Sequence, residues 1–356
     1  MKKIILTGGG TAGHVTPNIA LLPLLKAQGF EIHYIGSKDG LEKELIEAEG
    51  IPYHGISAGK LRRYFDIKNI TDIFRVIRGF GNAFSIIRQI KPDIVFSKGG
   101  FVTVPVLAAA RMLRVKSVSH ESDLTPGLAN KISGPFTNKI CVSFPETLAH
   151  LPTHKGVLTG SPIRKELLQG DKSKGLELCQ WSDGGKPVII VTGGSLGAAA
   201  INNAVREILP QLLSKYRVIH LCGKGNLAEI ELPGYAQFEY VKDELADLYA
   251  LADIVVSRAG ANTLFELLSM KKPNLLIPLP QGSSRGDQIL NAESFALQGF
   301  SKILPEGKIT DERLLNSIDL LYNERTIYAN NMAAHELNDG AAQVITVIND
   351  VINNQS

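Results

Sequence analysis

The first apolar run of the chain, IILTGG at residues 4–9, is nearly repeated by IIVTGG at residues 189–194. Each run places three apolar residues and a threonine before a pair of glycines, and each leads into a segment with helical spacing. A strand, a glycine turn and a helix form the opening of a βαβ unit. The near-repeat therefore predicts two α/β domains of the same kind.

Short apolar runs alternate with longer helical patterns in both halves of the chain, which predicts parallel strands joined by crossover helices. In the first half the expected strands are Ile4–Thr7, Ile32–Ile35, Asp93–Ser97, Ser117–Ser119 and Ile140–Ser143. In the second half they are Val188–Thr192, Val218–Leu221, Phe238–Val241, Ile254–Ser257 and Asn274–Ile277. The fold class is therefore α/β, with two doubly wound parallel sheets.

The boundary between the two domains is expected near GSPIR at residues 160–164, which precedes a polar stretch. This divides the chain into residues 1–162 and 163–356, with the helical tail 333–356 left open to pack on either domain. A hinge there would leave a cleft between the domains. Ligands of open α/β sheets bind at the carboxyl ends of parallel strands, so the cleft is the expected active site.

The composition excludes several classes of protein. The 356 residues, 44% of them hydrophobic, are enough for two cores, and a formal charge of +3 is too small to indicate nucleic acid. The three cysteines, Cys141, Cys179 and Cys222, follow no metal-binding or disulfide spacing, which favours a reducing compartment. No run approaches the roughly 20 apolar residues that span a bilayer, so any membrane contact is expected to be peripheral.

Three glycine loops each follow an expected strand: residues 8–13 (GGGTAG), 98–103 (KGGFVT) and 193–197 (GGSLG). Glycine lets the backbone approach a phosphate closely, while a helix N-terminus supplies N–H donors. The first loop also fits a dinucleotide fingerprint, but Ser37 ends the second strand where a nicotinamide site would have an acid. Since no P-loop is present, the loops favour diphosphate binding without phosphoryl transfer, and a dehydrogenase remains a weak alternative.

Six motifs in matching order resemble the MurG family of glycosyltransferases: GGGTAGHVTP (8–17), GGFV (99–102), HE (120–121), GSPIR (160–164), GGSLGA (193–198) and RAGANT through Glu266 (258–266). The resemblance implies a GT-B fold, with two Rossmann-like domains facing a cleft. It also implies inverting transfer of N-acetylglucosamine from UDP-N-acetylglucosamine to undecaprenyl-diphospho-N-acetylmuramoyl-pentapeptide, the lipid I to lipid II step of peptidoglycan synthesis. No cofactor is implied, and since no Asp-x-Asp pair follows a strand, the sequence requires no metal.

The resemblance assigns UDP-N-acetylglucosamine mainly to the second domain. Arg164 and Ser195 would hold the diphosphate, Val241 would lie against the uracil, and Glu266 would accept hydrogen bonds from the ribose. Thr263 and neighbouring N–H groups at the start of the helix that carries Glu266 would face the α-phosphate. The other implied donor contacts are Ala261, Asn262, Leu264, Phe265, Asp287, Gln288 and Asn291, and, from the first domain, Thr11, Ala12, Gly13 and Asp123.

His14 is the first candidate for the catalytic base, because a helix N-terminus disfavours the protonated imidazole. The alternative that His14 only binds an acceptor phosphate stays open, and Glu121 is the second candidate. The acceptor is expected at Gly99, Gly100, Phe101 and Thr103. Asp123 departs from the family, which often carries asparagine there, and a carboxylate cannot donate the hydrogen bonds of an amide.

A basic and apolar segment suggests a membrane surface. Lys60, Arg62, Arg63 and Lys68 precede Ile70, Ile73, Phe74, Ile77, Phe80 and Phe84, which recur at helical spacing among Arg75, Arg78 and Arg88. Such a helix is expected to bind anionic headgroups peripherally, on the cytoplasmic face of the bacterial cell membrane. A helix that packs the same stripe into the core is the alternative.

Two other functions remain open. One is a different GT-B enzyme, such as a diacylglycerol glucosyltransferase or a UDP-sugar epimerase. The other is a non-catalytic nucleotide-sugar-binding protein, which would leave UDP-N-acetylglucosamine intact with every acceptor. Product analysis separates all three.

Overall fold

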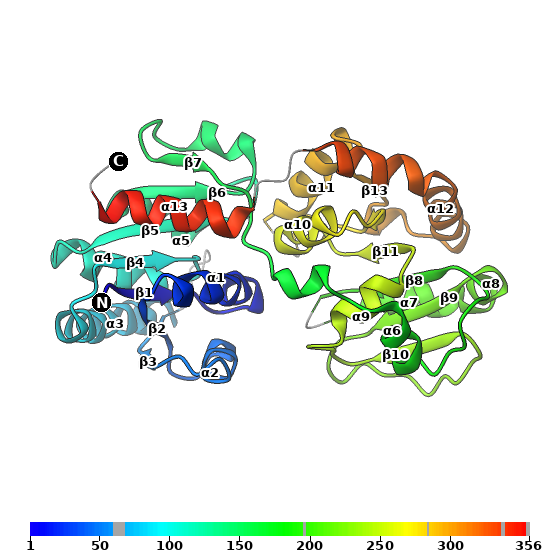
Figure 1. Cartoon of the computed structure of the whole chain (residues 1–356), viewed down its shortest axis with the longest axis horizontal. Coiled ribbons are helices and arrows are strands. Elements are labelled where there is room, and N and C mark those ends of the chain that lie inside the picture. Colours follow the sequence, from blue (N-terminus) through cyan, green and yellow to red (C-terminus); the bar gives the residue numbers. More distant parts are fainter. Residues whose placement is uncertain (60–67, 195–196, 283–284, 336–338, 354–356) are drawn as a thin grey trace. The chain divides into compact units, whose positions relative to one another are not determined.

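The computed structural model describes residues 1–59, 68–194, 197–282, 285–335 and 339–353, and for residues 68–73 it describes the backbone alone. The chain divides into two compact units (Figure 1). The first unit comprises Met1–Arg164 and Leu337–Ser356, and the second comprises Lys165–Glu336. Each unit has its own parallel sheet.

The sheet of the first unit has seven described strands in the order β3-β2-β1-β4-β5-β6-β7, and all neighbours are parallel. They are β1 (Lys3–Thr7), β2 (Glu31–Ser37), β3 (Tyr53–Ile56), β4 (Ile94–Ser97), β5 (Lys116–Glu121), β6 (Lys139–Val142) and β7 (Gly156–Leu158). The chain runs from β1 out to β3 and then returns to the other side of β1. This reversal makes a topological switch point between β1 and β4, the place where such sheets bind ligands.

The second sheet repeats this plan with six described strands in the order β10-β9-β8-β11-β12-β13. They are β8 (Val188–Thr192), β9 (Arg217–Leu221), β10 (Tyr235–Phe238), β11 (Ile254–Ser257), β12 (Asn274–Leu276) and β13 (Ser301–Ile303). Its switch point lies between β8 and β11.

Helices join the strands in both units. In the first unit they are α1 (Thr16–Ala27), α2 (Leu41–Glu47), α3 (Lys68–Ile90), α4 (Thr103–Met112), α5 (Leu128–Ser133) and α13 (Gly340–Ile352). In the second they are α6 (Lys172–Leu178), α7 (Ala199–Glu207), α8 (Leu209–Lys215), α9 (Leu245–Leu251), α10 (Ala261–Ser269), α11 (Asp287–Leu297) and α12 (Asp311–Ala334). Short 3₁₀ helices cover Ala12–His14, Gly134–Phe136, Pro145–His150, Lys165–Leu168 and Glu306–Lys308.

Both faces of each sheet are buried, which explains the continuous apolar runs in the sequence. In β1, Ile4 and Leu6 pack in a cluster with α1 and α13, while Ile5 packs on the other side with α3 and α4. In β8, Ile189 and Val191 pack with α7 and α12, while Ile190 packs with α6 and α9. The near-repeated runs therefore have the same structural role.

The last helix, α13, packs on the first unit. Val344 and Ile348 are buried in the cluster around α1, and the Lys116 ammonium donates to the Ile352 carbonyl at 2.9 Å. The Asp339 side chain caps the helix by accepting from the Ala342 N–H at 3.1 Å. The tail left open by the sequence thus contributes to the first core.

The expected strand at Phe238–Val241 is wrong by three residues, since β10 covers Tyr235–Phe238. Three further strands, β3, β7 and β13, were not expected from the sequence. All four lie at the edges of their sheets and contain mostly half-buried residues. Edge strands lack the continuous apolar run that reveals a central strand.

Candidate active site

Two buried side chains form hydrogen bonds with the backbone of the first glycine loop. The Tyr34 hydroxyl donates to the Gly8 carbonyl at 2.8 Å, and the Asn18 amide donates to the Thr7 and His14 carbonyls at 3.3 Å each. Burial raises the pKa of Tyr34 well above its usual value, so its hydroxyl keeps its proton. The backbone between β1 and α1 is therefore fixed by the protein itself.

A buried carboxylate, Glu42, supports the same loop. It accepts from the Ser37 N–H at 3.0 Å, the Ser37 hydroxyl at 2.5 Å and the Gly10 N–H at 3.4 Å. In a nicotinamide site, an acid at this end of β2 would bind the ribose. Glu42 is instead fully buried, and its carboxylate accepts hydrogen bonds from Ser37 and Gly10. This arrangement weighs against the dehydrogenase alternative.

His14 ends the short helix after this loop, and its Nδ1 atom lies 3.1 Å from the Lys98 carbonyl oxygen. Strands β1 and β4 are adjacent, so the loops that follow them meet. A carbonyl oxygen can only accept, which places the ring proton on Nδ1 and makes Nε2 the basic nitrogen of the neutral imidazole. Thr11 and Gly13 are exposed beside it, and Ala12 is half-buried.

The loop after β4 packs directly on the first glycine loop. Gly99 and Gly100 have φ angles of +89° and +92°, and a Cβ atom on Gly100 would overlap the Gly9 backbone. The Phe101 ring covers Gly10, where a Cβ atom would lie 2.8 Å from a ring carbon. The structure thus brings these expected acceptor residues together with His14.

Thr103, in contrast, is fully buried. Its hydroxyl donates to the Gly100 carbonyl at 2.9 Å, at the start of α4. It stabilises the turn, and its side chain is not exposed for contact with an acceptor.

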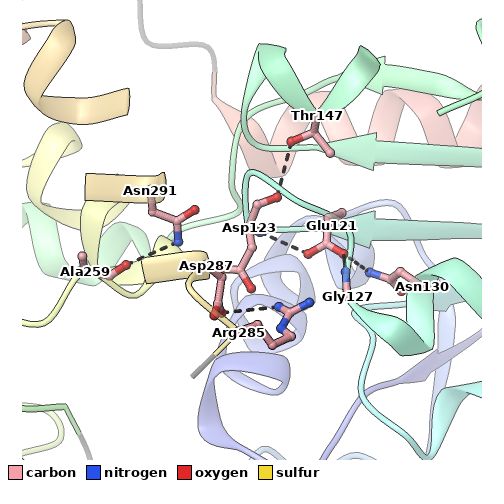
Figure 2. Close-up of polar contacts among 9 residues, drawn as sticks. All are labelled: Glu121, Asp123, Gly127, Asn130, Thr147, Ala259, Arg285, Asp287 and Asn291. Carbon is pink, nitrogen blue, oxygen red and sulfur yellow. Dashed lines mark hydrogen bonds and ion pairs between the residues drawn. The ribbon is translucent and has the colours of Figure 1, made fainter. Parts of the chain in front are cut away.

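At the end of β5, Glu121 organises the loop that follows (Figure 2). One carboxylate oxygen accepts from the Asp123 N–H at 3.1 Å. The other accepts from the Gly127 N–H at 2.7 Å and the Asn130 amide at 2.8 Å. With its side chain 5% exposed and three donors directed at it, Glu121 is arranged to hold this loop.

Beside Glu121, His120 is fully buried with Nε2 3.0 Å from the Gly160 carbonyl oxygen. Burial and the nearby Lys98 ammonium lower the pKa of His120 well below its usual value, so the ring is neutral. Asp123 is half-buried, and the Thr147 hydroxyl donates to its carbonyl at 3.3 Å (Figure 2).

Lys98, like Glu42, is a site residue that sequence reasoning missed. Its side chain is 1% exposed and its ammonium donates to the Ser122 hydroxyl. Burial lowers the pKa of Lys98 to about 8, against the opposing attraction of Glu121 and Asp123. A lysine directly after a buried apolar strand is the signal that could have drawn attention to it.

In the second unit, the expected donor residues follow β8, β10, β11 and β12. Ser195 lies outside the described residues, next to Gly194 with a φ angle of +86°. Val241 is half-buried after β10 and packs against a core cluster. Arg164, also half-buried, ends the first unit.

Helix α10 begins at the switch point of the second sheet, after Gly260. The first turn of a helix presents N–H groups that the helix itself does not bond, so it suits a phosphate. Asn262, Thr263, Phe265 and Glu266 are half-buried on this helix, and Ala261 is buried at its start. Leu264 differs from them: its side chain is fully buried and packs in the interior, and its N–H donates to the Gly260 carbonyl.

Three side chains of α11 fix the neighbouring loops. Asp287 pairs with Arg285 at 3.4 Å, and Gln288 accepts from the Leu279 N–H at 3.1 Å after β12. Asn291 is fully buried and donates to the Ala259 carbonyl at 3.3 Å, after β11 (Figure 2). Asn291 is therefore placed to support the loop before α10, with Asp287 and Gln288 nearer the start of the helix.

Among the described residues, no group of three His, Cys, Asp or Glu side chains could hold a metal ion.

Comparison with known proteins identifies the relatives of this chain. Residues 4–142 match the glycosyltransferase family 28 N-terminal domain, and residues 188–344 match the family 28 C-terminal domain. The chain is 56% identical over 348 residues to a protein of Clostridium novyi (strain NT) named UDP-N-acetylglucosamine--N-acetylmuramyl-(pentapeptide) pyrophosphoryl-undecaprenol N-acetylglucosamine transferase. That match covers 97% of this chain and 98% of the relative. A protein of the same name from Clostridium botulinum (strain Langeland) is 55% identical, with 98% and 99% covered.

Two solved structures share the fold. MurG of Acinetobacter baumannii has a TM-score of 0.75 and 24% identity, with 98% of this chain and 100% of that chain covered. The kitacinnamycin glycosyltransferase has a TM-score of 0.76 and 15% identity, with 98% of each chain covered.

Two Rossmann-like units with glycine loops at their switch points make a GT-B fold, and the two matched family domains make the chain a glycosyltransferase. Within that class, the chain belongs to glycosyltransferase family 28, in the branch of the MurG-type N-acetylglucosamine transferases.

Proposed function

We propose that this chain transfers N-acetylglucosamine from UDP-N-acetylglucosamine to N-acetylmuramyl-(pentapeptide) pyrophosphoryl-undecaprenol, with inversion at the anomeric carbon. The observation that carries the proposal is the 56% identity, over 97% of the chain, to a transferase of that name. The first unit is assigned to the acceptor and the second to the nucleotide sugar.

His14 is proposed as the general base. An acceptor hydroxyl oxygen attacks the anomeric carbon of the donor while its proton passes to Nε2 of His14. The bond from the anomeric carbon to the diphosphate oxygen breaks, and UDP leaves with the electron pair. The contact between Nδ1 and the Lys98 carbonyl supports this role, because it sets the tautomer that leaves Nε2 basic.

The second unit is proposed to stabilise the departing UDP. The N-terminal turn of α10, with Asn262 and Thr263, suits the developing negative charge on the α-phosphate, and Arg164 and Ser195 are assigned to the diphosphate. Glu266, half-buried on α10, is assigned to the ribose hydroxyls. Val241, Asp287 and Gln288 are assigned to the uracil and the sugar.

We also propose that α3 contacts an anionic membrane surface peripherally, on the cytoplasmic face. Phe74 is 69% exposed and Ile77 is 61% exposed, and both lie beside exposed Arg75 and Arg78. Exposed apolar side chains with a basic margin suit the boundary between headgroups and acyl chains. The apolar residues further along α3, such as Ala83 and Ile87, pack in the core, so that end of the helix follows the core-packing alternative. The expected residues 60–67, and the side chains of residues 68–73, lie outside the described part.

None of the helices in the described part of the chain is long and apolar enough to cross a membrane.

The test is transfer of labelled N-acetylglucosamine to the lipid-linked acceptor by the unmodified chain and by Glu266→Ala. Losing the carboxylate that binds the ribose is expected to raise the donor KM by about 10-fold or more. Glu293→Ala, at an exposed position of α11, is the matched control and is expected to leave the donor KM unchanged. Donor binding without transfer to this acceptor would overturn the proposal.

A further inference from the structure

A series of buried hydrogen bonds in the second unit, the His220 network, crosses from β10 through β9 to α7. Nδ1 of His220 lies 3.0 Å from the Tyr235 hydroxyl oxygen, and Nε2 lies 3.1 Å from the Asn202 amide oxygen. The Asn202 amide nitrogen donates to the Cys222 carbonyl at 2.9 Å. All four residues are buried, and none of them is assigned to the donor or the base.

The direction of each hydrogen bond in the His220 network is fixed. A carbonyl oxygen can only accept, so the amide NH₂ group of Asn202 faces Cys222 and the amide oxygen faces His220. That oxygen also only accepts, which places the ring proton of His220 on Nε2 and leaves Nδ1 to accept from Tyr235. Burial lowers the pKa of His220 to about 4, so the ring is neutral near pH 7. Each donor in the network is therefore required by the next acceptor.

The last acceptor of the network, the Cys222 carbonyl, lies directly against Gly197. A Cβ atom on Gly197 would overlap this carbonyl oxygen, so the two backbones are in close contact. The Gly197 N–H donates in turn to the Gly194 carbonyl at 2.9 Å. Gly194 and Gly197 belong to the second glycine loop, so the Cys222 carbonyl limits where the described end of this loop can lie.

A second side chain of α7 holds the same segment after β9. Arg206 lies one helical turn after Asn202, and it donates to the Asn226 carbonyl at 2.6 Å and to Cys222 Sγ at 3.4 Å. The helix that follows the second glycine loop is thus bonded twice to the segment that packs on Gly197. The loop, the helix and this segment form one bonded unit.

Equivalent positions support the glycine loop of the first unit. Tyr34 lies opposite Leu6 in the pair of β1 and β2, and His220 lies opposite Val191 in the pair of β8 and β9. Leu6 and Val191 occupy the same place in the near-repeated runs. In the first unit the Tyr34 hydroxyl and the Asn18 amide donate to the loop backbone. The His220 network is the counterpart in the second unit, with the Cys222 carbonyl as the group that touches the loop.

We propose that His220 is a positioning residue for the nucleotide sugar, and that it acts through Asn202 and the Cys222 carbonyl to hold Gly197 and the start of α7 in place for the diphosphate. The inference rests on the proposed function, which assigns the donor to the second unit. Because His220 is fully buried, it affects donor binding only through this network.

The test is the affinity of the unmodified chain and its variants for UDP, measured by isothermal titration calorimetry. His220→Phe keeps a ring but removes the donor to Asn202, and it is expected to weaken UDP binding by about 10-fold. His220→Gln can still donate to Asn202, and it is expected to bind UDP within about 3-fold of the unmodified chain. In the transfer assay, His220→Phe should raise the donor KM and leave the acceptor KM unchanged.

A matched pair of variants separates positioning from a loss of stability, and it also covers the case in which His220→Phe does not fold. Tyr235→Phe removes the hydroxyl that donates to His220. Tyr216→Phe removes a hydroxyl that donates to Asp319 at 2.7 Å, from a tyrosine buried in the same core cluster. Tyr235→Phe is expected to weaken UDP binding by about 3-fold, whereas Tyr216→Phe is expected to leave it unchanged.

Three results would overturn the inference alone: unchanged UDP affinity in His220→Phe, no recovery of affinity in His220→Gln, or equal losses of affinity in Tyr235→Phe and Tyr216→Phe. If the unmodified chain itself does not bind UDP, the proposed function fails, and the inference fails with it.

Discussion

The imidazole of His14 is hydrogen-bonded through Nδ1 to the carbonyl oxygen of Lys98, at 3.1 Å. The two residues come from loops that follow adjacent strands, β1 and β4, on either side of the switch point. The contact orients the ring and selects its tautomer at the same time. The reaction proposed for this site depends on both effects.

Replacing His14 is expected to lower kcat by about 10²- to 10⁴-fold, the usual contribution of a general base. His14→Asn is the sharper variant, because the asparagine amide can still donate toward Lys98 but offers no basic nitrogen. Steady-state kinetics with both substrates measure the effect. If His14 only binds the acceptor phosphate, the acceptor KM will rise while kcat is largely kept. His154→Ala, at an exposed histidine of the same unit, is the control.

Glu121→Gln is expected to destabilise the protein by about 1–3 kcal/mol. Both carboxylate oxygens now accept hydrogen bonds, and in the variant the NH₂ group of the amide would replace one of these acceptors and face a donor. The three donors are the Asp123 and Gly127 N–H groups and the Asn130 amide. Thermal unfolding measures the loss, with Glu44→Gln at an exposed position of α2 as the control. A large loss of kcat at unchanged stability would instead favour Glu121 as the base.

Two glycine substitutions are expected to change the stability of the protein in opposite directions. Gly100→Ala places a Cβ atom against the Gly9 backbone at a φ angle of +92°, so it should lower both stability and kcat. Gly81→Ala, in α3, meets nothing within 4 Å and removes a helix-destabilising glycine, so it should raise stability by about 0.5–1 kcal/mol. Denaturant or thermal unfolding of both variants checks the pair. Equal changes in stability for the two variants would mean that the loops after β1 and β4 do not require close contact.

The central strands could be predicted from the sequence because a strand buried on both faces is a continuous apolar run. Val188–Thr192 and Ile254–Ser257 match the structure residue for residue. The edge strands β3, β7 and β13 could not, since partial burial leaves them with no such run. The alternation of strands and helices was sufficient to predict the fold class, although these edge strands were missed.

The candidate site was predictable where backbone chemistry demands a residue type, as in the glycine loops around His14 and Gly100. Roles that depend on tertiary burial were not. The sequence marks Leu264 and Thr103 as contacts by their place in a motif, but their side chains are fully buried. Glu42 and Lys98 were missed for the opposite reason, because charged residues are expected at the surface until the fold buries them among partners.

The double variant Phe74→Ser/Ile77→Ser is expected to weaken binding to vesicles that contain anionic lipid. Each buried apolar side chain contributes about 1.5–3 kcal/mol, so the affinity should fall by more than about 10-fold. Vesicle co-sedimentation measures this, and Leu297→Ser/Ile327→Ser, at exposed apolar positions of the second unit, is the control. Equal losses in the two double variants would show that α3 has no special membrane role.

Activity and stability are expected to change in opposite directions with pH because of Lys98. The pKa of Lys98 is lowered from 10.5 to about 8 by burial, so kcat should fall as the ammonium loses its proton above that pH. The groups facing it do not explain this change. Burial raises the pKa of Cys141 to about 12 and keeps the pKa of His120 far below neutral. The other charged groups that act on Lys98 are Glu121 and Asp123.

Because the pKa is lowered in the folded state, the unfolded chain binds more protons between about pH 8 and 10.5, and the contribution of Lys98 to the free energy of unfolding rises across this window. The measurement is kcat and thermal unfolding at about pH 7 and about pH 9.5, for the unmodified chain and Lys98→Met. The variant should lose both trends, since it has no group at position 98 to titrate. An alkaline fall in kcat that persists unchanged in the variant would assign the titration to another residue.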